Sequence, residues 1–263
     1  MIRIRNESNM QIIIGKAGQV SLWVIIAIAI VAIVGLLALL RQKPLPEIDN
    51  IESPERTIES CARDAIYETV KLMAPQGGFV SPRNYKKYDN INVAYLCENI
   101  GYFETCINQH PSLLAEIKEE IYNNSINKIE NCFVDSTEEL KKKNIKVESG
   151  ETNLKIDLAP QRIKVSINKK MTLSSKEGTK NIEDFNFEIR HPLYELALVA
   201  NEIASQEAKY CYFEYVGYMI LYPEFDIKKT ALSDSTKIYT ILHKDSNSEM
   251  NIAIRSCAIP PGI

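Results

Sequence analysis

Six cysteines are the residues of this sequence with the clearest capacity for chemistry. All of them follow an apolar segment near the N-terminus, and none precedes it. An even number of cysteines on one side of such a segment is typical of an oxidising compartment, where thiols form disulfides. Six buried thiols in a cytosolic domain are the alternative. The order of the chain suggests three disulfides, Cys61–Cys132, Cys97–Cys106 and Cys211–Cys257.

Residue patterns that would indicate catalysis or a bound metal are weak. There is no CxxC motif, and the spacing from Cys97 to Cys106 is not usual for zinc. The three histidines, His110, His191 and His243, stand apart, and no nucleophile motif such as GxSxG accompanies them. We therefore expect a protein that is not an enzyme and has no metal or cofactor. A membrane-tethered hydrolase is the weakest alternative, and it would need a cleft that joins a histidine to a cysteine, serine or carboxylate.

Two further features bear on what the protein contacts. Asn123 begins an N-x-S sequon and is a possible glycosylation site on the part of the chain expected outside the cell. Residues 210–225 are rich in aromatic side chains, which fits core packing or a surface that contacts a protein or glycan. These aromatic residues are Tyr210, Tyr212, Phe213, Tyr215, Tyr218, Tyr222 and Phe225.

The apolar segment has the length of a membrane-spanning helix. Residues 17–40 contain no charge, and residues 20–40 are almost wholly apolar. At about 1.5 Å per residue, roughly 20 such residues cross a hydrocarbon core of about 30 Å. We expect a transmembrane helix over residues 19–41, in contact with membrane lipid through residues 20–40.

Charge helps to orient the chain and to exclude one class of partner. Basic residues flank the apolar segment on both sides, which favours a cytoplasmic N-terminus only slightly. The cysteines favour the same orientation, with the C-terminal domain outside the cell membrane. Residues 1–43 carry a net charge of +4, so −7 remains for the rest of a chain whose total is −3. This weakly acidic domain argues against a nucleic acid partner.

Residues 16–22 (KAGQVSL) introduce the apolar segment with a distinctive pattern. The pattern resembles the archaeal class III, or type IV pilin-like, signal peptide, in which cleavage falls just before a glutamine that opens the helix. The resemblance implies cleavage between Gly18 and Gln19 and a cell-surface, pilin-like protein. The family usually has glutamate at the fifth mature position, where this chain has Trp23, and this departure puts assembly into a filament in doubt.

Beyond the helix, three stretches resemble uncharacterised single-pass membrane proteins of DPANN-type archaea. The resemblance implies placement and architecture, but no activity. The stretches are residues 58–61 (IESC), 75–80 (PQGGFV), and the pair 237–240 (KIYT) and 253–256 (AIRS).

The remaining chain shows two kinds of hydrophobic period. Residues 1–18 form the basic leader, and residues 42–56, with three prolines, form a stalk. In residues 57–148 a helical spacing predicts helices over 57–73, 92–100 and 111–133, with Ser53 and Pro54 at the start of the first and Gly77 after its end. This segment is the expected helical subdomain.

Residues 149–263 alternate with the period of strands. Residues 154–158 and 163–167 predict a hairpin, with further strands over 185–189, 237–242 and 251–257. Residues 192–210 have the spacing of one helix. The expected fold is therefore α+β: a transmembrane helix, a helical subdomain, then an antiparallel sheet with one packed helix.

These features favour a membrane-anchored extracytoplasmic structural or interaction protein, either pilin-like or an adhesion or envelope component. Its protein or glycan partner is not indicated by the sequence. The alternative is an accessory subunit of a membrane secretion or pilus-assembly complex. An uncleaved signal anchor would favour this alternative.

Overall fold

The computed structural model describes residues 26–34, 53–101 and 103–257. The chain divides into two compact units, Met1–Ile51 and Glu52–Ile263. In the first unit residues 26–34 form a helix in which every residue is exposed. The rest of the helix expected over 19–41 lies outside the described residues, as do the leader and residues 42–52 of the stalk. Within the described ranges, no helix combines the length and the apolar character needed to cross a membrane.

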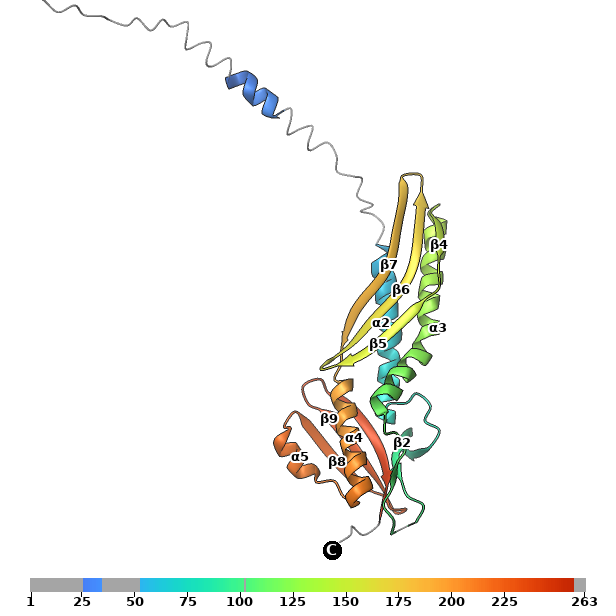
Figure 1. The fold of residues 1–263 in the computed structure, drawn as a ribbon, viewed down its shortest axis with the longest axis vertical. Coiled ribbons are helices and arrows are strands. Elements are labelled where there is room, and N and C mark those ends of the chain that lie inside the picture. Colours follow the sequence, from blue (N-terminus) through green and yellow to red (C-terminus); the bar gives the residue numbers. More distant parts are fainter. Residues whose placement is uncertain (1–25, 35–52, 102, 258–263) are drawn as a thin grey trace, which may run out of the picture. The chain divides into compact units, whose positions relative to one another are not determined.

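The second unit has an α+β fold, as expected, and contains two sheets (Figure 1). In the four-stranded sheet, the long strands β6 (Arg162–Ser175) and β7 (Gly178–Arg190) form an antiparallel hairpin. The other side of β6 pairs with β5 (Asn153–Ala159) and then with β4 (Lys146–Ser149). The hairpin expected over residues 154–158 and 163–167 is therefore confirmed as β5 and β6, and both strands belong to a larger sheet.

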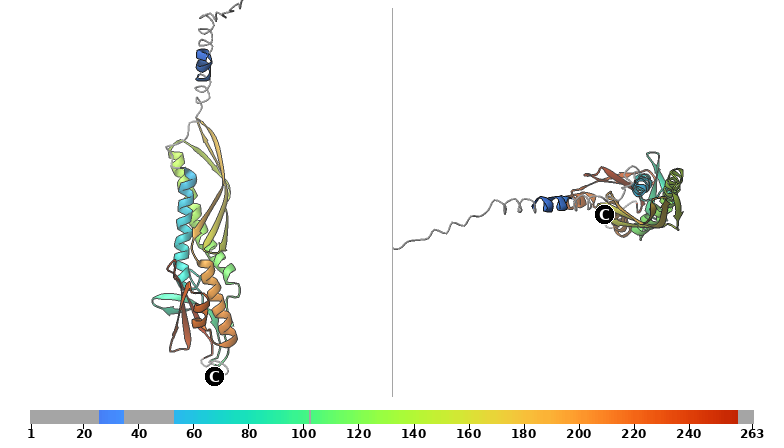
Figure 2. Two further views of the ribbon diagram at one scale, coloured as in Figure 1. Left: turned by 90° about the vertical axis from the view of Figure 1, so that its left-hand side faces the viewer. Right: turned by 90° about the horizontal axis from the view of Figure 1, so that it is seen from above.

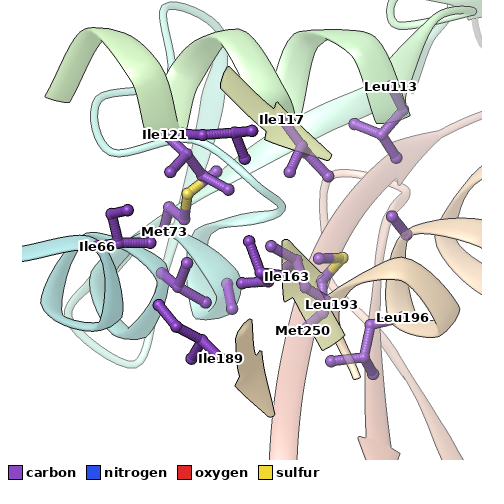
Figure 3. Close-up of a cluster of buried hydrophobic side chains, with 14 of the residues drawn as sticks. Ile66, Met73, Leu113, Ile117, Ile121, Ile163, Ile189, Leu193, Leu196 and Met250 are labelled. Carbon is purple, nitrogen blue, oxygen red and sulfur yellow. The ribbon is translucent and has the colours of Figure 1, made fainter. Parts of the chain in front are cut away.

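Two helices cover one face of the four-stranded sheet (Figure 2). These are α2 (Pro54–Met73), which begins with Ser53 and Pro54 as expected, and α3 (Leu113–Lys142). Every second residue of β6 is buried against them, beginning with Ile163. Full burial of such side chains contributes about 1.5–3 kcal/mol each. Figure 3 shows a cluster in which this core continues toward the six-stranded sheet, with Ile66, Met73, Leu113, Ile117, Ile121, Ile163, Ile189, Leu193, Leu196 and Met250.

The opposite face of this sheet is polar and exposed. Side chains pair across β6 and β7, with Ser166 Oγ 2.6 Å from Asn186 Oδ1 and Asn168 Nδ2 2.7 Å from Asp184 Oδ1. Thr172 Oγ1 lies 3.0 Å from Asn181 Oδ1 in the same arrangement. We call this set the polar ladder: Ser166, Asn168, Thr172, Asn181, Asp184 and Asn186.

The six-stranded sheet joins the two ends of the unit. Its order is β1 (Tyr85–Tyr88), β2 (Ile91–Glu98), β10 (Ser248–Arg255), β9 (Thr236–His243) and β8 (Phe225–Ala231), and β3 (Ile107–Asn108) pairs with β2. β2 and β10 are parallel, so the segments 57–148 and 149–263 share one sheet. The strands expected over 237–242 and 251–257 are confirmed as β9 and β10.

The prediction of a helix over residues 92–100 is wrong, because residues 92–98 belong to the strand β2. Five consecutive residues of β2 are buried, so apolar side chains occupy both faces and the period-two signal of a strand is lost. On one face Ala94 and Leu96 belong to the main core, under the helix α4 (Leu193–Tyr210). On the other face Val93 and Tyr95 form a smaller cluster with Ile238 and Ala253.

A glycine turn separates α2 from the six-stranded sheet. α2 continues into a 3-10 turn, η1 (Ala74–Gln76), and Gly77 then adopts a left-handed φ of 82°. A Cβ at this position would lie 3.1 Å from both the Ala94 side chain and the Asn251 carbonyl oxygen. Glycine is therefore required here by both the backbone conformation and the close approach of two strands.

Candidate interaction surface

The six cysteines form the three expected pairs. Cys61–Cys132 joins α2 to α3, Cys97–Cys106 closes the loop between β2 and β3, and Cys211–Cys257 joins the end of α4 to the end of β10. Their Cα atoms are 5.9, 5.4 and 5.5 Å apart, respectively. No described cysteine is free. Each disulfide thus connects elements that the hydrophobic core also holds together.

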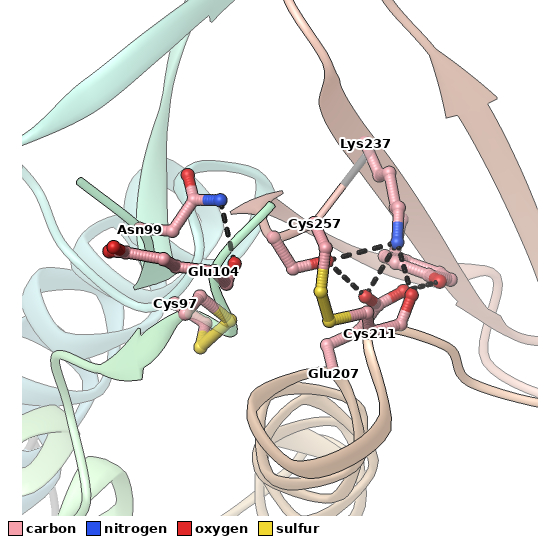
Figure 4. Close-up of polar contacts among 10 residues, drawn as sticks. Cys97, Asn99, Glu104, Glu207, Cys211, Lys237 and Cys257 are labelled. Carbon is pink, nitrogen blue, oxygen red and sulfur yellow. Dashed lines mark hydrogen bonds and ion pairs between the residues drawn. A yellow bond between two sulfur atoms is a disulfide. The ribbon is translucent and has the colours of Figure 1, made fainter. Parts of the chain in front are cut away.

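A buried polar cluster surrounds the Cys211–Cys257 disulfide (Figure 4). Glu207, on α4, is fully buried. Its Oε2 atom accepts hydrogen bonds from Lys237 Nζ at 2.6 Å and from Ser256 Oγ at 2.6 Å, and Oε1 accepts one from the Tyr239 hydroxyl. Lys237 Nζ also donates to the Cys211 carbonyl oxygen at 2.7 Å. The cluster therefore fixes the C-terminal end of α4 on β9 and β10.

The aromatic segment that follows this disulfide leads into a short helix, α5 (Tyr215–Leu221). Phe213 is buried, with its ring centroid 6.1 Å from Tyr239 and 5.4 Å from Tyr218. Met219 Sδ accepts a hydrogen bond from the Ile227 amide of β8 at 3.1 Å. Core packing, the more conservative interpretation of the aromatic segment, therefore holds for the inner side of α5.

The outer side of α5 is apolar and exposed. Ile220 and Leu221 are each 76% exposed, and Val216 and Tyr222 are also exposed. α5 contains no charged residue (YVGYMIL), and none of its residues is buried. A helix that is apolar all round is normally enclosed, and contiguous exposed apolar residues mark interaction sites. We call Val216, Ile220, Leu221 and Tyr222 the α5 surface.

A second apolar feature lies on the loop between β2 and β3. Ile100, Phe103 and Ile107 are exposed there. The Cys97–Cys106 disulfide closes the loop, and Asn99 Nδ2 donates to the carbonyl oxygens of Gly101 at 2.6 Å and Glu104 at 2.9 Å (Figure 4). The loop is thus held in shape, but it lacks the regular helix that presents the α5 surface.

The structure brings two of the three histidines together. His191 and His243 line a cleft of about 290 Å³ that also includes Tyr67, Asp245 and Ser246. Burial, with a smaller contribution from His243, lowers the pKa of His191 to about 4. His110 lies elsewhere, with Nδ1 2.5 Å from Glu116 Oε2. The spacing of the histidines along the chain does not predict this pairing.

A hydrolase would need a serine beside a histidine, and the cleft contains such a contact. His243 Nδ1 lies 3.0 Å from Ser246 Oγ. That hydroxyl also accepts a hydrogen bond from the Ser248 amide at 3.3 Å, so it caps the turn between β9 and β10. Among the described residues, no carboxylate forms a hydrogen bond with His191 or His243. The contact is therefore explained by the turn.

The remaining expected sites differ in what the structure shows of them. Asn123 is exposed in the middle of α3, and Ser125 of the same sequon is buried, with its hydroxyl 3.1 Å from Thr69 Oγ1. Gly18 and Gln19 lie outside the described residues.

Comparison with known proteins gives no relative on which to base a function. No protein-family model, no curated protein and no solved structure matches the chain.

Proposed function

We propose that this chain is a membrane-anchored, extracytoplasmic interaction protein whose α5 surface binds a partner protein. The observation that carries the proposal is that α5 is apolar on every side, while its outer residues Ile220 and Leu221 remain exposed. Burial of apolar area removes such side chains from water and favours association.

The placement outside the membrane is supported by the N-terminal sequence and the cysteines. Residues 20–40 have the length and composition of a transmembrane helix, and the leader resembles a class III signal peptide. The folded unit contains three disulfides, which persist in oxidising compartments.

A protein partner fits the α5 surface better than a glycan does. Val216, Ile220 and Leu221 are aliphatic and offer no side-chain hydrogen bond, whereas sugar hydroxyls require such bonds when they are buried. Aliphatic contact with another apolar protein surface satisfies these residues completely. An accessory subunit of a secretion or pilus-assembly complex would use the surface in the same way.

The proposed surface is tested by placing charge on it. In full-length protein solubilised from native membranes, I220E/L221E should abolish a discrete complex seen on native gels. V134E/L72E is the matched control, because Val134 and Leu72 are exposed aliphatic residues on α3 and α2. Both variants should keep their stability to within about 0.5 kcal/mol, as is usual for exposed positions. Equal loss of the complex in both variants, or in neither, would refute the role of α5.

The proposed anchor is tested by fractionation and N-terminal sequencing. The protein should sediment with membranes and be released by detergent. A mature N-terminus at Gln19 supports the pilin-like pathway, and one at Met1 supports a signal anchor within a complex. Recovery of the intact, full-length chain in the soluble fraction without detergent would overturn the membrane placement.

A further inference from the structure

We propose that the partner of the α5 surface is a second copy of this chain, whose loop between β2 and β3 packs against it. The loop contributes Ile100, Phe103 and Ile107, which we call the loop surface. The contact is heterologous, because two different surfaces meet and each copy carries both of them. This inference rests on the proposed function, since it names the partner that the α5 surface binds.

The two surfaces lie at opposite edges of the six-stranded sheet, and Figure 1 shows α5 and β2 on its two sides. Cys97 and Glu98 of β2 pair with β3 on one side and with β10 on the other, so β3 is at an edge. α5 contacts β8, the strand that ends the sheet order on the other side. Three strand spacings of about 4.8 Å each therefore separate β2 from β8. One folded unit can thus use both surfaces at once, each with a different neighbour.

The loop surface is apolar and even more exposed than the α5 surface. Ile100 is 93% exposed, and Phe103 is 80% exposed. Exposed apolar residues that group together mark an interaction site. A contact between two α5 surfaces would leave both loop surfaces in water. The heterologous contact buries one surface of each kind and so gains apolar burial from both.

The loop is constrained, so it loses little conformational entropy when it is bound. The Cys97–Cys106 disulfide closes it, and Asn99 Nδ2 donates hydrogen bonds to the carbonyl oxygens of Gly101 and Glu104 inside it. Surfaces that are ordered before association pay less for ordering on binding. The loop therefore has its binding shape before it meets α5.

Charge also suits this pair of surfaces. Glu104 of the loop is exposed, and Lys229 of β8 lies beside the start of α5, with Nζ 5.2 Å from the centroid of the Tyr215 ring. Neither charged group forms an ion pair within the part of the chain that the structure describes. Glu214, which precedes α5, is already hydrogen-bonded to the Tyr212 hydroxyl at 2.5 Å. The loop therefore brings a carboxylate to a surface that has a cation beside it and no charge of its own.

A heterologous contact repeats, because each copy keeps one surface of each kind uncovered after the first contact forms. Such contacts close into rings or continue as open rows. Copies anchored in one membrane have the same orientation relative to it, and a contact between opposite edges of one sheet joins copies side by side. We therefore expect assemblies larger than a dimer.

The test is co-expression of two full-length variants with different tags, with assembly masses measured in detergent by native mass spectrometry. I100E/F103E removes the loop surface, and I220E/L221E removes the α5 surface. All four side chains are exposed, so both variants should fold. Each variant alone should self-associate at least about 30-fold more weakly than the wild type, as for hot-spot residues of an interface. Together they should form a one-to-one heterodimer and nothing larger, because one intact surface of each kind remains.

The matched control is V134E/L72E, which should assemble as the wild type does, because its charges lie on α3 and α2. A monomeric wild type, a self-associating I220E/L221E or the absence of the heterodimer would overturn the inference. If the wild type does not self-associate but I220E/L221E loses a complex with another protein, this inference fails and the proposed function stands. If I220E/L221E loses no complex of any kind, both fail.

A second measurement keeps the contact in the membrane, where detergent cannot dissociate it. A photoreactive phenylalanine analogue at Phe103 differs little from the natural side chain. On illumination it should crosslink to α5 of a differently tagged copy, as mapped by mass spectrometry of the adduct. Adducts only with other proteins, or none in protein that is folded and membrane-bound, would contradict the inference.

Discussion

The two sheets of the folded unit present opposite kinds of surface. The four-stranded sheet is covered on one face by α2 and α3, and its other face carries the polar ladder, whose side chains bond one another across β6 and β7. The six-stranded sheet is buried on both faces at its centre, and beside it α5 exposes apolar side chains. The polar groups of the ladder are already hydrogen-bonded to one another, so they leave few hydrogen bonds for a partner. The exposed apolar side chains of α5 would be stabilised by burial against a partner.

The comparison also concerns two ion pairs: Glu207 and Lys237 are paired in the buried cluster beside the six-stranded sheet, and Glu188 and Arg162 are paired on the exposed face of the four-stranded sheet. Glu207→Ala in the buried cluster should cost about 3–5 kcal/mol, because Lys237 is left without its carboxylate partner. Glu188→Ala on the four-stranded sheet removes a pair with Arg162 at 3.0 Å, in which both side chains are about half exposed, and should cost at most about 1 kcal/mol. Urea denaturation measures both values. Equal costs would mean that the buried cluster does not hold α4 on the six-stranded sheet.

For the disulfides the expected order of stability costs is reversed, because the larger cost falls in the half with the four-stranded sheet. Cys61–Cys132, in the half with the four-stranded sheet, spans 71 residues, and Cys97–Cys106, on the six-stranded sheet, spans 9. From the loss of chain entropy in the unfolded state, removing the first should cost about 4 kcal/mol and removing the second about 3 kcal/mol. Paired Cys→Ala substitutions and denaturation would show the order. A larger cost for removing Cys97–Cys106 would indicate that this disulfide also stabilises the folded state, beyond its effect on the entropy of the unfolded chain.

The junction of the two sheets should be sensitive to acid through His191. Its pKa is about 4 in the folded state and 6.5 when exposed, so between these values the unfolded chain binds more protons. Stability is thus fully present above about pH 6.5 and is lost as the pH falls toward 4, by at most about 3 kcal/mol. Denaturation at a series of pH values, with H191Q as the comparison, tests this. An acid loss of the same size in H191Q would assign it to other groups.

The two sheets also differ in what the sequence could predict. Strands with one covered face alternate, so the β5–β6 hairpin followed from residues 154–167. β2 is buried on both faces, so its apolar residues also fit a helical spacing, and the expectation for residues 92–100 was wrong. α5 is apolar all round and only seven residues long, so it carried no period at all.

The candidate sites show the same limit. The aromatic composition of residues 210–225 indicated a core or a surface, and the structure assigns Phe213 to the core and Tyr222 to the surface. The closeness of His191 and His243, far apart in sequence, depends on how the two sheets meet. Only Cys97–Cys106 joins elements that are adjacent in the chain; Cys61–Cys132 and Cys211–Cys257 span 71 and 46 residues, and they were expected because they would join two long helices and a helix end to the last strand.

The most direct test of the account is photo-crosslinking at the α5 surface. A photoreactive phenylalanine analogue placed at Ile220 in the full-length membrane protein should yield one discrete protein adduct, and the same analogue at Val134 should yield none. Adducts with lipid alone, or no adduct at position 220 under conditions where the protein is folded and membrane-bound, would contradict the proposal that α5 docks a partner protein.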